Sequence, residues 1–422
     1  MKSFLKSGLA RNTGWMLVGQ GLKLIIQALY FTVIARSLGV SNYGAFIGAA
    51  ALVGVVYPFG TLGSGFLLIK NVARDQTLFP YYWGRALITT AASSSLLFAI
   101  VFLLSHFMLP TDIPRRLVLL VSASDLFGLS FITLCGQAFQ AFEQLNWTAT
   151  INVLISTSRL GASAVFVAFY HHPSALQWGY VYFYSTAAVV LVSGVLVTVR
   201  LSAPEFPGLR LTKETREGFY FSASFSAQTV YNDIDKTMLA RLGSLDATGI
   251  YGAAYRLIEV IVIPITSLRA AAYPNFFRTG ADGIEGCLSY GRRPTLAALG
   301  YAVLASMAVF ALAGIVPYVL GSEYAATVDA LRWLAVLPIL RTLHYFSSDA
   351  LSGAGHQGLR ASIQVGVAGF NVLINLWLIP AYSWRGAAWS SIGSDALLAG
   401  SIGIAVWVVS RRPLRSAVRA FS

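Results

Sequence analysis

The sequence predicts an all-α, polytopic membrane protein with twelve transmembrane helices in two six-helix lobes. Three observations predict this fold class: the composition, the length of the uncharged stretches and an internal repeat. The chain has 422 residues, of which 56% are hydrophobic and 11% are charged, whereas about 25% of residues are charged in an average soluble protein. This composition excludes an ordinary soluble enzyme, a disordered chain, a disulfide-stapled secreted domain and a nucleic-acid binder that uses a basic soluble face.

Uncharged or nearly uncharged stretches run along the whole chain. A bilayer core about 30 Å thick requires about 20 apolar residues per helix, and stretches of this length bounded by charge, proline or glycine predict twelve spans. The first stretch carries Lys23 and continues past Tyr30, so we interpret it as a span and not as a signal peptide. The predicted spans are 14–36, 44–69, 85–109, 117–141, 147–170, 176–199, 220–242, 247–276, 294–320, 326–352, 360–380 and 386–410.

The orientation follows from the basic residues of the short loops. Most of the 30 Lys and Arg residues lie on one side of the predicted spans. Loops rich in Lys and Arg stay in the cytoplasm. We therefore expect both termini to be cytoplasmic.

An internal repeat divides the chain into two halves. The end of the first span and the opening of the second match the end of the seventh and the opening of the eighth, at one constant offset close to half the chain length. Two halves of six spans each enter the membrane from the same side, so a pseudo-two-fold axis along the membrane normal relates them. The matched positions are Ala35, Arg36, Gly44, Phe46 and Ala49 with Ala240, Arg241, Gly249, Tyr251 and Ala254. The predicted lobes are residues 1–199 and 220–422, joined by a cytoplasmic linker at 200–219.

Charged side chains occur inside the predicted spans. A charge at a helix centre costs about 2.5–3.5 kcal/mol on insertion scales, so these groups require a partner or a hydrated cavity. Polar stripes at helical spacing accompany several of them, and such stripes cannot face lipid. We expect these stripes to converge on one cationic central cavity between the lobes.

The embedded residues fall into two predicted classes. Candidates for binding a substrate with phosphate and sugar groups are Lys23, Arg159, Arg256, Arg341, Gln20, Gln27, Asn152, Asn371 and Asn375. Candidates for ion coupling or gating are Asp125, Asp233, Asp235, Lys236, Glu259 and Asp395.

A purely structural interpretation competes with each of these roles. Asp233 with Lys236, and Arg256 with Glu259, are three residues apart and can form intrahelical ion pairs. Lys23, Arg159 and Arg341 have no acid three or four residues away on their own helices. For these three cations the pattern favours anion binding over pairing between helices.

Several motifs are excluded as chemical sites. Residues 353–358 fit the glycine-rich dinucleotide fingerprint by letter, but they join two membrane spans, so we interpret them as a tight turn. Gly44 and Gly48 predict close helix packing. We expect no enzyme activity, no metal and no cofactor.

Short sequences in both halves carry a resemblance to a known family. They are Ala-Arg-Ser-Leu-Gly at 35–39, Tyr-Asn-Asp-Ile-Asp-Lys at 231–236, Gly-Ile-Tyr-Gly-Ala-Ala-Tyr-Arg at 249–256, Asn-Leu-Trp-Leu-Ile-Pro at 375–380 and Trp-Arg-Gly-Ala-Ala at 384–388. With them the chain resembles the polysaccharide-transporter branch, of O-antigen flippase type, of the multidrug/oligosaccharidyl-lipid/polysaccharide exporter superfamily. The resemblance covers nearly the whole chain through the order of the spans. It implies a flippase of the bacterial inner membrane that moves undecaprenyl-diphosphate-linked oligosaccharide from the cytoplasmic to the periplasmic leaflet.

The resemblance also implies where the substrate binds and which partners the protein has. In the related lipid II flippases a cationic cavity receives the diphosphate, and Lys23 and Arg256 lie on comparable helices here. The expected partners are the lipid-linked oligosaccharide itself and a polysaccharide polymerase with its chain-length protein, and we expect a monomer. Two alternatives stay open: a multidrug or small-metabolite antiporter that depends on the embedded acids, and a membrane-embedded glycan polymerase or ligase.

Overall fold

The computed structural model describes residues 8–170, 173–206, 229 and 233–411, without the side chains of residues 8–20, 23, 24, 274 and 281. Helices and short connections make up this described part, and it contains no strand. The chain forms two compact units, Met1–Gly249 and Ile250–Ser422. The first unit thus includes residues 233–249, which follow the predicted linker.

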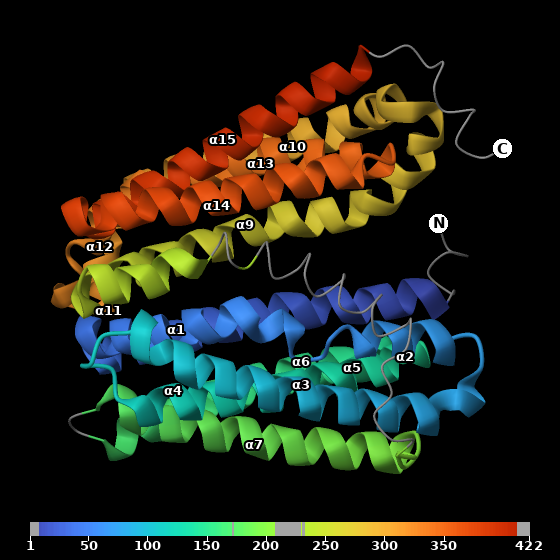
Figure 1. Cartoon of the computed structure of the whole chain (residues 1–422), viewed down its shortest axis with the longest axis horizontal. Helices are drawn as coiled ribbons and strands as arrows, with labels where there is room; N and C mark the ends of the chain where they lie inside the picture. The colour runs from blue at the N-terminus through green and yellow to red at the C-terminus, as the bar shows by residue number, and fades with distance from the viewer. Residues whose placement is uncertain (1–7, 171–172, 207–228, 230–232, 412–422) are drawn as a thin grey trace. The chain divides into compact units, whose positions relative to one another are not determined.

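The first unit contains the following helices in chain order (Figure 1). They are α1 (Gly8–Val56), η2 (Tyr57–Phe59), α2 (Ser64–Val72), η3 (Gln76–Leu78), α3 (Phe79–Met108), α4 (Arg115–Ser122), η4 (Ala123–Leu129), α5 (Ser130–Ala141), α6 (Leu145–Phe169), α7 (Ala175–Arg200) and the helical residues 233–242.

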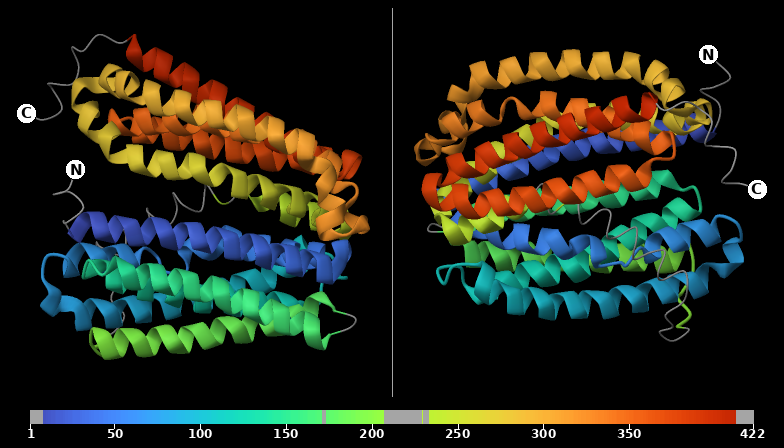
Figure 2. Two further views of the ribbon diagram at one scale, coloured as in Figure 1. Left: turned by 180° about the vertical axis from the view of Figure 1, so that it is seen from behind. Right: turned by 45° about the horizontal axis from the view of Figure 1, so that its top comes forward.

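The second unit is built from long helices that lie alongside one another (Figure 2). Helix α9 begins in the first unit and continues into the second. The elements are α9 (Leu245–Thr279), η5 (Gly280–Asp282), α10 (Gly283–Leu312), η6 (Ala313–Ile315), α11 (Val316–Leu320), η7 (Ser322–Tyr324), α12 (Thr327–Leu334), α13 (Leu337–Gly353), α14 (Gln357–Tyr382) and α15 (Trp384–Ser410).

Each predicted span corresponds to a helical segment, and the differences lie at the ends and the breaks. The expected loop between the first two spans is a kink inside α1, where Gly39 has a φ of 70° and a ψ of 173°. Glycine adopts this backbone without steric cost, so helix continues on both sides. The second span is interrupted before α2, at Leu62 and Gly63, which both have positive φ. Of the seventh predicted span, 220–242, the structure describes Thr229 and residues 233–242.

Nine helices of the described part are long and apolar enough to cross a membrane. One of them, Ile25–Val72, contains residues 25–36 of the first predicted span and the whole of the second. The tenth predicted span is divided between α12, with 8 residues, and α13, with 17 residues, so neither helix reaches the length of a span by itself. The chain is therefore an all-α, multi-pass membrane protein.

Close helix packing in the first unit depends on small residues. A Cβ atom on Gly44 would overlap the backbone carbonyl of Leu245, and one on Gly249 would overlap the backbone of Val40. A Cβ on Gly48 would lie 2.8 Å from Cβ of Ala240. The prediction of close packing at Gly44 and Gly48 is confirmed, and the repeat-related Gly44 and Gly249 each lie against the other's helix.

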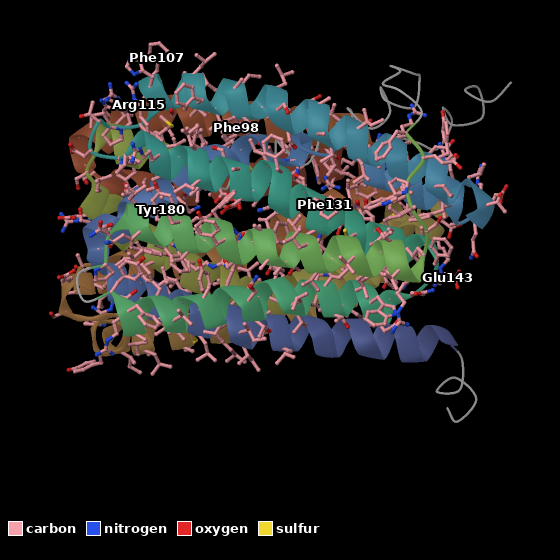
Figure 3. The ribbon with its side chains drawn as sticks, turned by 90° about the horizontal axis from the view of Figure 1, so that it is seen from below. Phe98, Phe107, Arg115, Phe131, Glu143 and Tyr180 are labelled. Carbon is pink, nitrogen blue, oxygen red and sulfur yellow. The ribbon has the colours of Figure 1, made fainter. Side chains whose placement is uncertain are left out.

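A hydrophobic core fixes the remaining helices of the first unit. Side chains from α2, α3, α5, α6 and α7 meet there, including the fully buried Leu68, Trp83 and Phe139. The composite span α4–η4–α5 crosses this bundle, and Figure 3 shows Arg115 and Glu143 near its opposite ends. Its middle segment η4, which packs against α3 and α7, carries the first embedded carboxylate.

Candidate functional site

The embedded charges of the first unit centre on Asp125. The phenolic hydroxyl of Tyr182 on α7 donates a hydrogen bond to Oδ1 of Asp125 at 2.8 Å. The Nη2 atom of Arg159 on α6 lies 3.6 Å from the same oxygen, and its guanidinium carbon lies 4.0 Å from the centre of the Tyr182 ring. We call these three residues the Asp125 centre.

The Asp125 centre lies on an irregular helical segment. Residues Ala123–Leu129 form a π-helix, η4, and π segments inside α-helices are frequent at functional sites. The Ser94 hydroxyl of α3 donates to the carbonyl oxygen of Leu126 at 2.6 Å. Gly128 allows α7 to approach, since a Cβ there would lie 2.6 Å from Cγ2 of Thr186. Contacts from the neighbouring helices α3 and α7 thus stabilise the π segment. The sequence pattern did not predict this segment.

Arg159 has two buried nitrogens without a hydrogen-bond partner. Among the described residues, no acceptor reaches its Nε or its Nη2 atom, although the ion pair with Asp125 lies within 4 Å. Arg159 forms an ion pair with an acid on another span, which is the alternative that the sequence pattern placed second to anion binding. Arg159 nevertheless keeps two buried nitrogens that have no acceptor among the described residues.

The second unit contains a more deeply buried cluster, the Asp395 centre. Asp395 on α15 lies 3.0 Å from Nε2 of His344 and 3.4 Å from Nε of Arg341, both on α13. Arg341 also donates to the hydroxyl of Tyr255 on α9. All four side chains are at most 5% exposed. Interhelical pairing is again what the structure shows, where the sequence favoured anion binding by Arg341.

A third cluster, the Asp349 centre, was not among the predicted site residues. Arg269 on α9 donates two hydrogen bonds to the carboxylate of Asp349 on α13, at 2.7 and 2.9 Å. Nη1 of Arg360 on α14 lies 3.8 Å from the same carboxylate and donates to Ser352 at 2.7 Å. Two guanidinium groups thus share one carboxylate. Because Arg269 and Asp349 are 80 residues apart, no local spacing reveals them.

The pairs at helical spacing are intrahelical. Lys236 lies 2.7 Å from Asp233 and 3.8 Å from Asp235. Arg256 lies 3.0 Å from Glu259, and these two side chains are 40% and 34% exposed. For both pairs the observed contacts are the intrahelical ion pairs that the spacing of three residues allows.

The polar residues predicted to bind substrate differ in the contacts that they make. Asn371 donates to Ser394 of α15 at 3.0 Å, and Asn375 accepts from Ser390 of α15, so both asparagines link α14 to α15. Asn152 donates back to the carbonyl of Thr148 in its own helix. Gln27 is half-buried on α1. The side chains of Gln20 and Lys23 lie outside the described residues.

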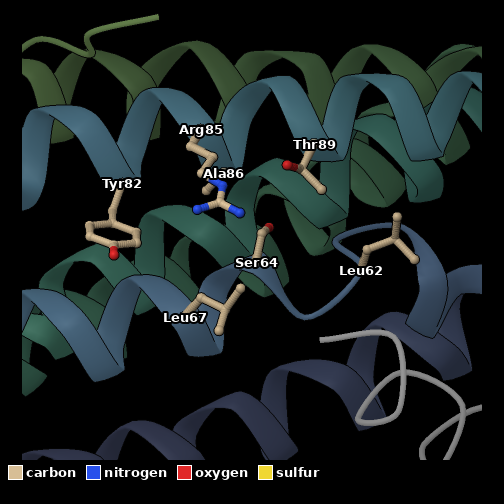
Figure 4. A pocket seen from close by; sticks show the side chains of 7 residues that line it. All are labelled: Leu62, Ser64, Leu67, Tyr82, Arg85, Ala86 and Thr89. Carbon is tan, nitrogen blue, oxygen red and sulfur yellow. The ribbon is translucent and has the colours of Figure 1, made fainter. Parts of the chain in front are cut away.

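The structure tests other kinds of site as well. The described residues contain no group of three or more histidine, cysteine, aspartate or glutamate side chains that could hold a metal ion. A small pocket of about 10 Å³ lies between α2 and α3, where Arg85 points toward Ser64 (Figure 4). This volume accommodates about one water molecule. The Gly353–Gly358 turn joins α13 to α14, as predicted, with Gly355 at a positive φ of 84°.

Residues 9–280 match the family model described as polysaccharide biosynthesis protein. The chain belongs to the polysaccharide biosynthesis protein family. An uncharacterized membrane protein of Methanocaldococcus jannaschii is 18% identical over 291 residues, which are 67% of this chain and 57% of the relative. The chain thus spans less than two thirds of the length of that curated relative.

Solved structures of transporters share the fold of this family member. An inward-facing multidrug resistance MATE-family transporter of the MOP superfamily is 13% identical, with a TM-score of 0.72 over 94% of this chain and 99% of that chain. The MATE multidrug transporter DinF-BH is 13% identical, with a TM-score of 0.65 over 96% of each chain. A MOP-superfamily transporter from Pyrococcus furiosus, described by a binding pocket of reverse polarity, is 14% identical, with a TM-score of 0.62 over 97% of this chain and 98% of that chain. These likenesses show the fold that the chain shares with the three transporters.

Proposed function

We propose that this protein is a flippase that translocates undecaprenyl-diphosphate-linked oligosaccharide units from the cytoplasmic to the periplasmic leaflet of a bacterial inner membrane. The family match supports the substrate class, since lipid-linked repeat units are intermediates of polysaccharide biosynthesis. The observation that carries the proposal is the Asp349 centre, where two arginines share one carboxylate.

The charge of the Asp349 centre suits a phosphate group. Arg269 and Arg360 together carry two positive charges against the single negative charge of Asp349. Among the described residues no second carboxylate lies within 4 Å of either guanidinium. Arginine binds phosphate through paired hydrogen bonds, so the excess charge favours an anionic headgroup over a cationic drug.

The location of the Asp349 centre suits the pick-up of substrate. Arg360 lies in the first turn of α14, and Asp349 lies about one turn before the end of α13. The predicted orientation assigns this end of the helices to the cytoplasm, where the lipid-linked unit would enter. The hydrated diphosphate and sugars cannot cross hydrocarbon unaided. Alternating access would therefore expose the bound headgroup to each face in turn while the prenyl chain stays in lipid.

The proposal is tested by transport in proteoliposomes. The substrate is a prenyl-diphosphate-linked disaccharide with a fluorophore on the sugar, and a membrane-impermeant quencher reports the leaflet that holds it. Arg360→Gln leaves the Arg269–Asp349 pair intact, so the protein should fold while the initial rate falls about tenfold or more. Arg332→Gln, at an exposed arginine 4.0 Å from Asp329, is the matched control and should keep the wild-type rate. An Arg360→Gln protein with full activity would overturn this function.

A cation-coupled antiporter is the second candidate. The observation that favours it is the pair of buried carboxylates, Asp125 and Asp395, which lie 2.8 and 3.0 Å from neutral or titratable partners. In that case Asp125→Asn or Asp395→Asn should abolish efflux of a cationic dye, and Arg360→Gln should not affect it.

A further inference from the structure

The two arginines of the Asp349 centre are held in different ways. Arg269 uses its Nε and Nη2 atoms to bind both oxygens of the Asp349 carboxylate, at 2.7 and 2.9 Å. Arg360 approaches the same carboxylate with Nη1, at 3.8 Å, which is beyond hydrogen-bond distance. The hydrogen bond of that nitrogen goes instead to Oγ of Ser352, at 2.7 Å. Arg360 therefore lies next to Asp349 without donating a hydrogen bond to it.

The hydroxyl of Ser352 is oriented to accept this hydrogen bond. Its own proton is donated to the carbonyl oxygen of Ser348, one turn back on α13, at 3.0 Å. The lone pairs of Oγ therefore remain for Arg360. Ser352 is 2% exposed, so bulk water does not replace the hydroxyl at this position. The serine thus fixes the Nη1 end of the guanidinium.

The other edge of the Arg360 guanidinium is available to a ligand. The side chain is 19% exposed. Its Nε and Nη2 atoms are not among the nitrogens that are buried without a partner, in contrast to Nε and Nη2 of Arg159. Each of them therefore reaches solvent or a partner, and Tyr273 on α9 is such a side-chain partner. A phenolic hydroxyl both donates and accepts hydrogen bonds, so Tyr273 is compatible with an anion bound at this edge.

The serine has a specific effect on the charge of this centre. Without Ser352, Nη1 of Arg360 would be free to close the gap of 3.8 Å to Asp349, and this ion pair would compete with a phosphate group. Fixing the flexible arginine side chain in advance also lowers the entropy cost of binding. We propose that Ser352 is a positioning residue, which holds Arg360 apart from Asp349 and directs its Nε–Nη2 edge to a phosphate of the substrate. This inference rests on the proposed function, because that function assigns phosphate to the Asp349 centre.

Protection of Arg360 from phenylglyoxal tests the site with a simple phosphate compound. Phenylglyoxal modifies accessible guanidinium groups, and mass spectrometry identifies the modified residues. The purified full chain in lipid nanodiscs is treated with it at increasing concentrations of inorganic pyrophosphate, while sodium chloride keeps the ionic strength constant. We expect pyrophosphate to protect Arg360 in the wild type. No protection at any concentration would overturn this inference together with the proposed function.

Two serine variants test the positioning role by itself. Ser352→Ala should raise the pyrophosphate concentration that gives half protection by about threefold to tenfold, as expected for the loss of one hydrogen bond. Ser362→Ala on α14 is the matched control, because its exposed hydroxyl also bonds one turn back, to Gly358 at 3.0 Å. This control should keep the wild-type value. Equal protection of the wild type and Ser352→Ala would overturn the inference and leave the proposed function standing.

Transport separates positioning from a merely structural role. In the proteoliposome assay, Ser352→Ala should raise KM by about threefold to tenfold and leave kcat within about twofold, because the arginine acts on substrate binding. In the Arg360→Gln background the same substitution should leave KM unchanged, since the serine acts through the arginine. An equal rise of KM in both backgrounds, or a fall of kcat with KM unchanged, would overturn the positioning role.

Discussion

The two units hold their embedded carboxylates in different ways. In the first unit, Asp125 receives a phenolic hydrogen bond, and its arginine lies 3.6 Å away. In the second unit, Asp349 receives two guanidinium hydrogen bonds at 2.7 and 2.9 Å. A carboxylate held by two charge-assisted bonds is a fixed counter-ion, whereas one held by a neutral donor can exchange its partner at lower cost. The difference indicates that Asp349 holds Arg269 in a fixed position and leaves Arg360, at 3.8 Å, the arginine of that centre more available to a substrate. Asp125, by contrast, can exchange its partner.

The largest loss of stability is expected at the Asp395 centre, whose charged side chains are deeply buried. Arg341→Met leaves Asp395 buried without its guanidinium partner, which should lower the free energy of unfolding by about 3–5 kcal/mol. Thermal unfolding of the purified protein in detergent measures the loss. The double variant Arg341→Met, Asp395→Leu removes both charges and should recover most of it. A single variant as stable as the wild type would show that this pair does not support the second unit.

A smaller effect is expected at the Asp125 centre. In Asp125→Asn the amide oxygen still accepts from Tyr182, and Arg159 keeps its contact with the ring. The loss should therefore be about 1–3 kcal/mol, below that of Arg341→Met in the same unfolding measurement. A loss equal to or greater than that of Arg341→Met would reverse the comparison between the units.

The phenolic hydrogen bond can be removed by itself. Tyr182→Phe keeps the ring beneath Arg159 and deletes only the donor to Asp125, so the cost should be about 1 kcal/mol. Tyr184→Phe, on an exposed tyrosine of the same helix, is the control and should have no measurable cost. If both variants behave alike, Arg159 alone holds the carboxylate.

The smallest effect on stability is expected for Arg360→Gln. Asp349 retains both hydrogen bonds from Arg269, and the second arginine is the more distant one at 3.8 Å. The free energy of unfolding should fall by less than about 1 kcal/mol. Arg269→Gln in the same assay should cost more, because it breaks both bonds. An equal cost would mean that the two arginines hold Asp349 equivalently.

The sequence predicts the helices of this protein well because the bilayer imposes one length and one polarity on every span. The breaks are less predictable. Gly39 was expected in a loop and instead lies at a kink inside α1, and the π segment at Asp125 depends on contacts from Ser94 and Thr186 that no local pattern records.

The same limit applies to the candidate sites. The sequence identified Arg159, Arg341 and Asp125 as embedded charges, because any charge inside a span stands out. It did not pair them, because Arg341 and Asp395 are 54 residues apart in sequence and lie on different helices. Arg360 is the first residue of the eleventh predicted span, and only the fold brings it to Asp349. Spacing reveals partners on one helix, whereas partners on different helices require the packing.

The wider turn at Ala123–Leu129 has a mechanical consequence. One additional residue in a helical turn offsets the side chains beyond it by about 100° relative to an uninterrupted α-helix. If the wide turn shifted to another position along the span α4–η4–α5, Asp125 would rotate away from Tyr182. Arg115 and Ala141, at the two ends of the span, would keep their positions. A carboxylate could in this way change its neighbours through a local rewinding, without the displacement of a whole helix.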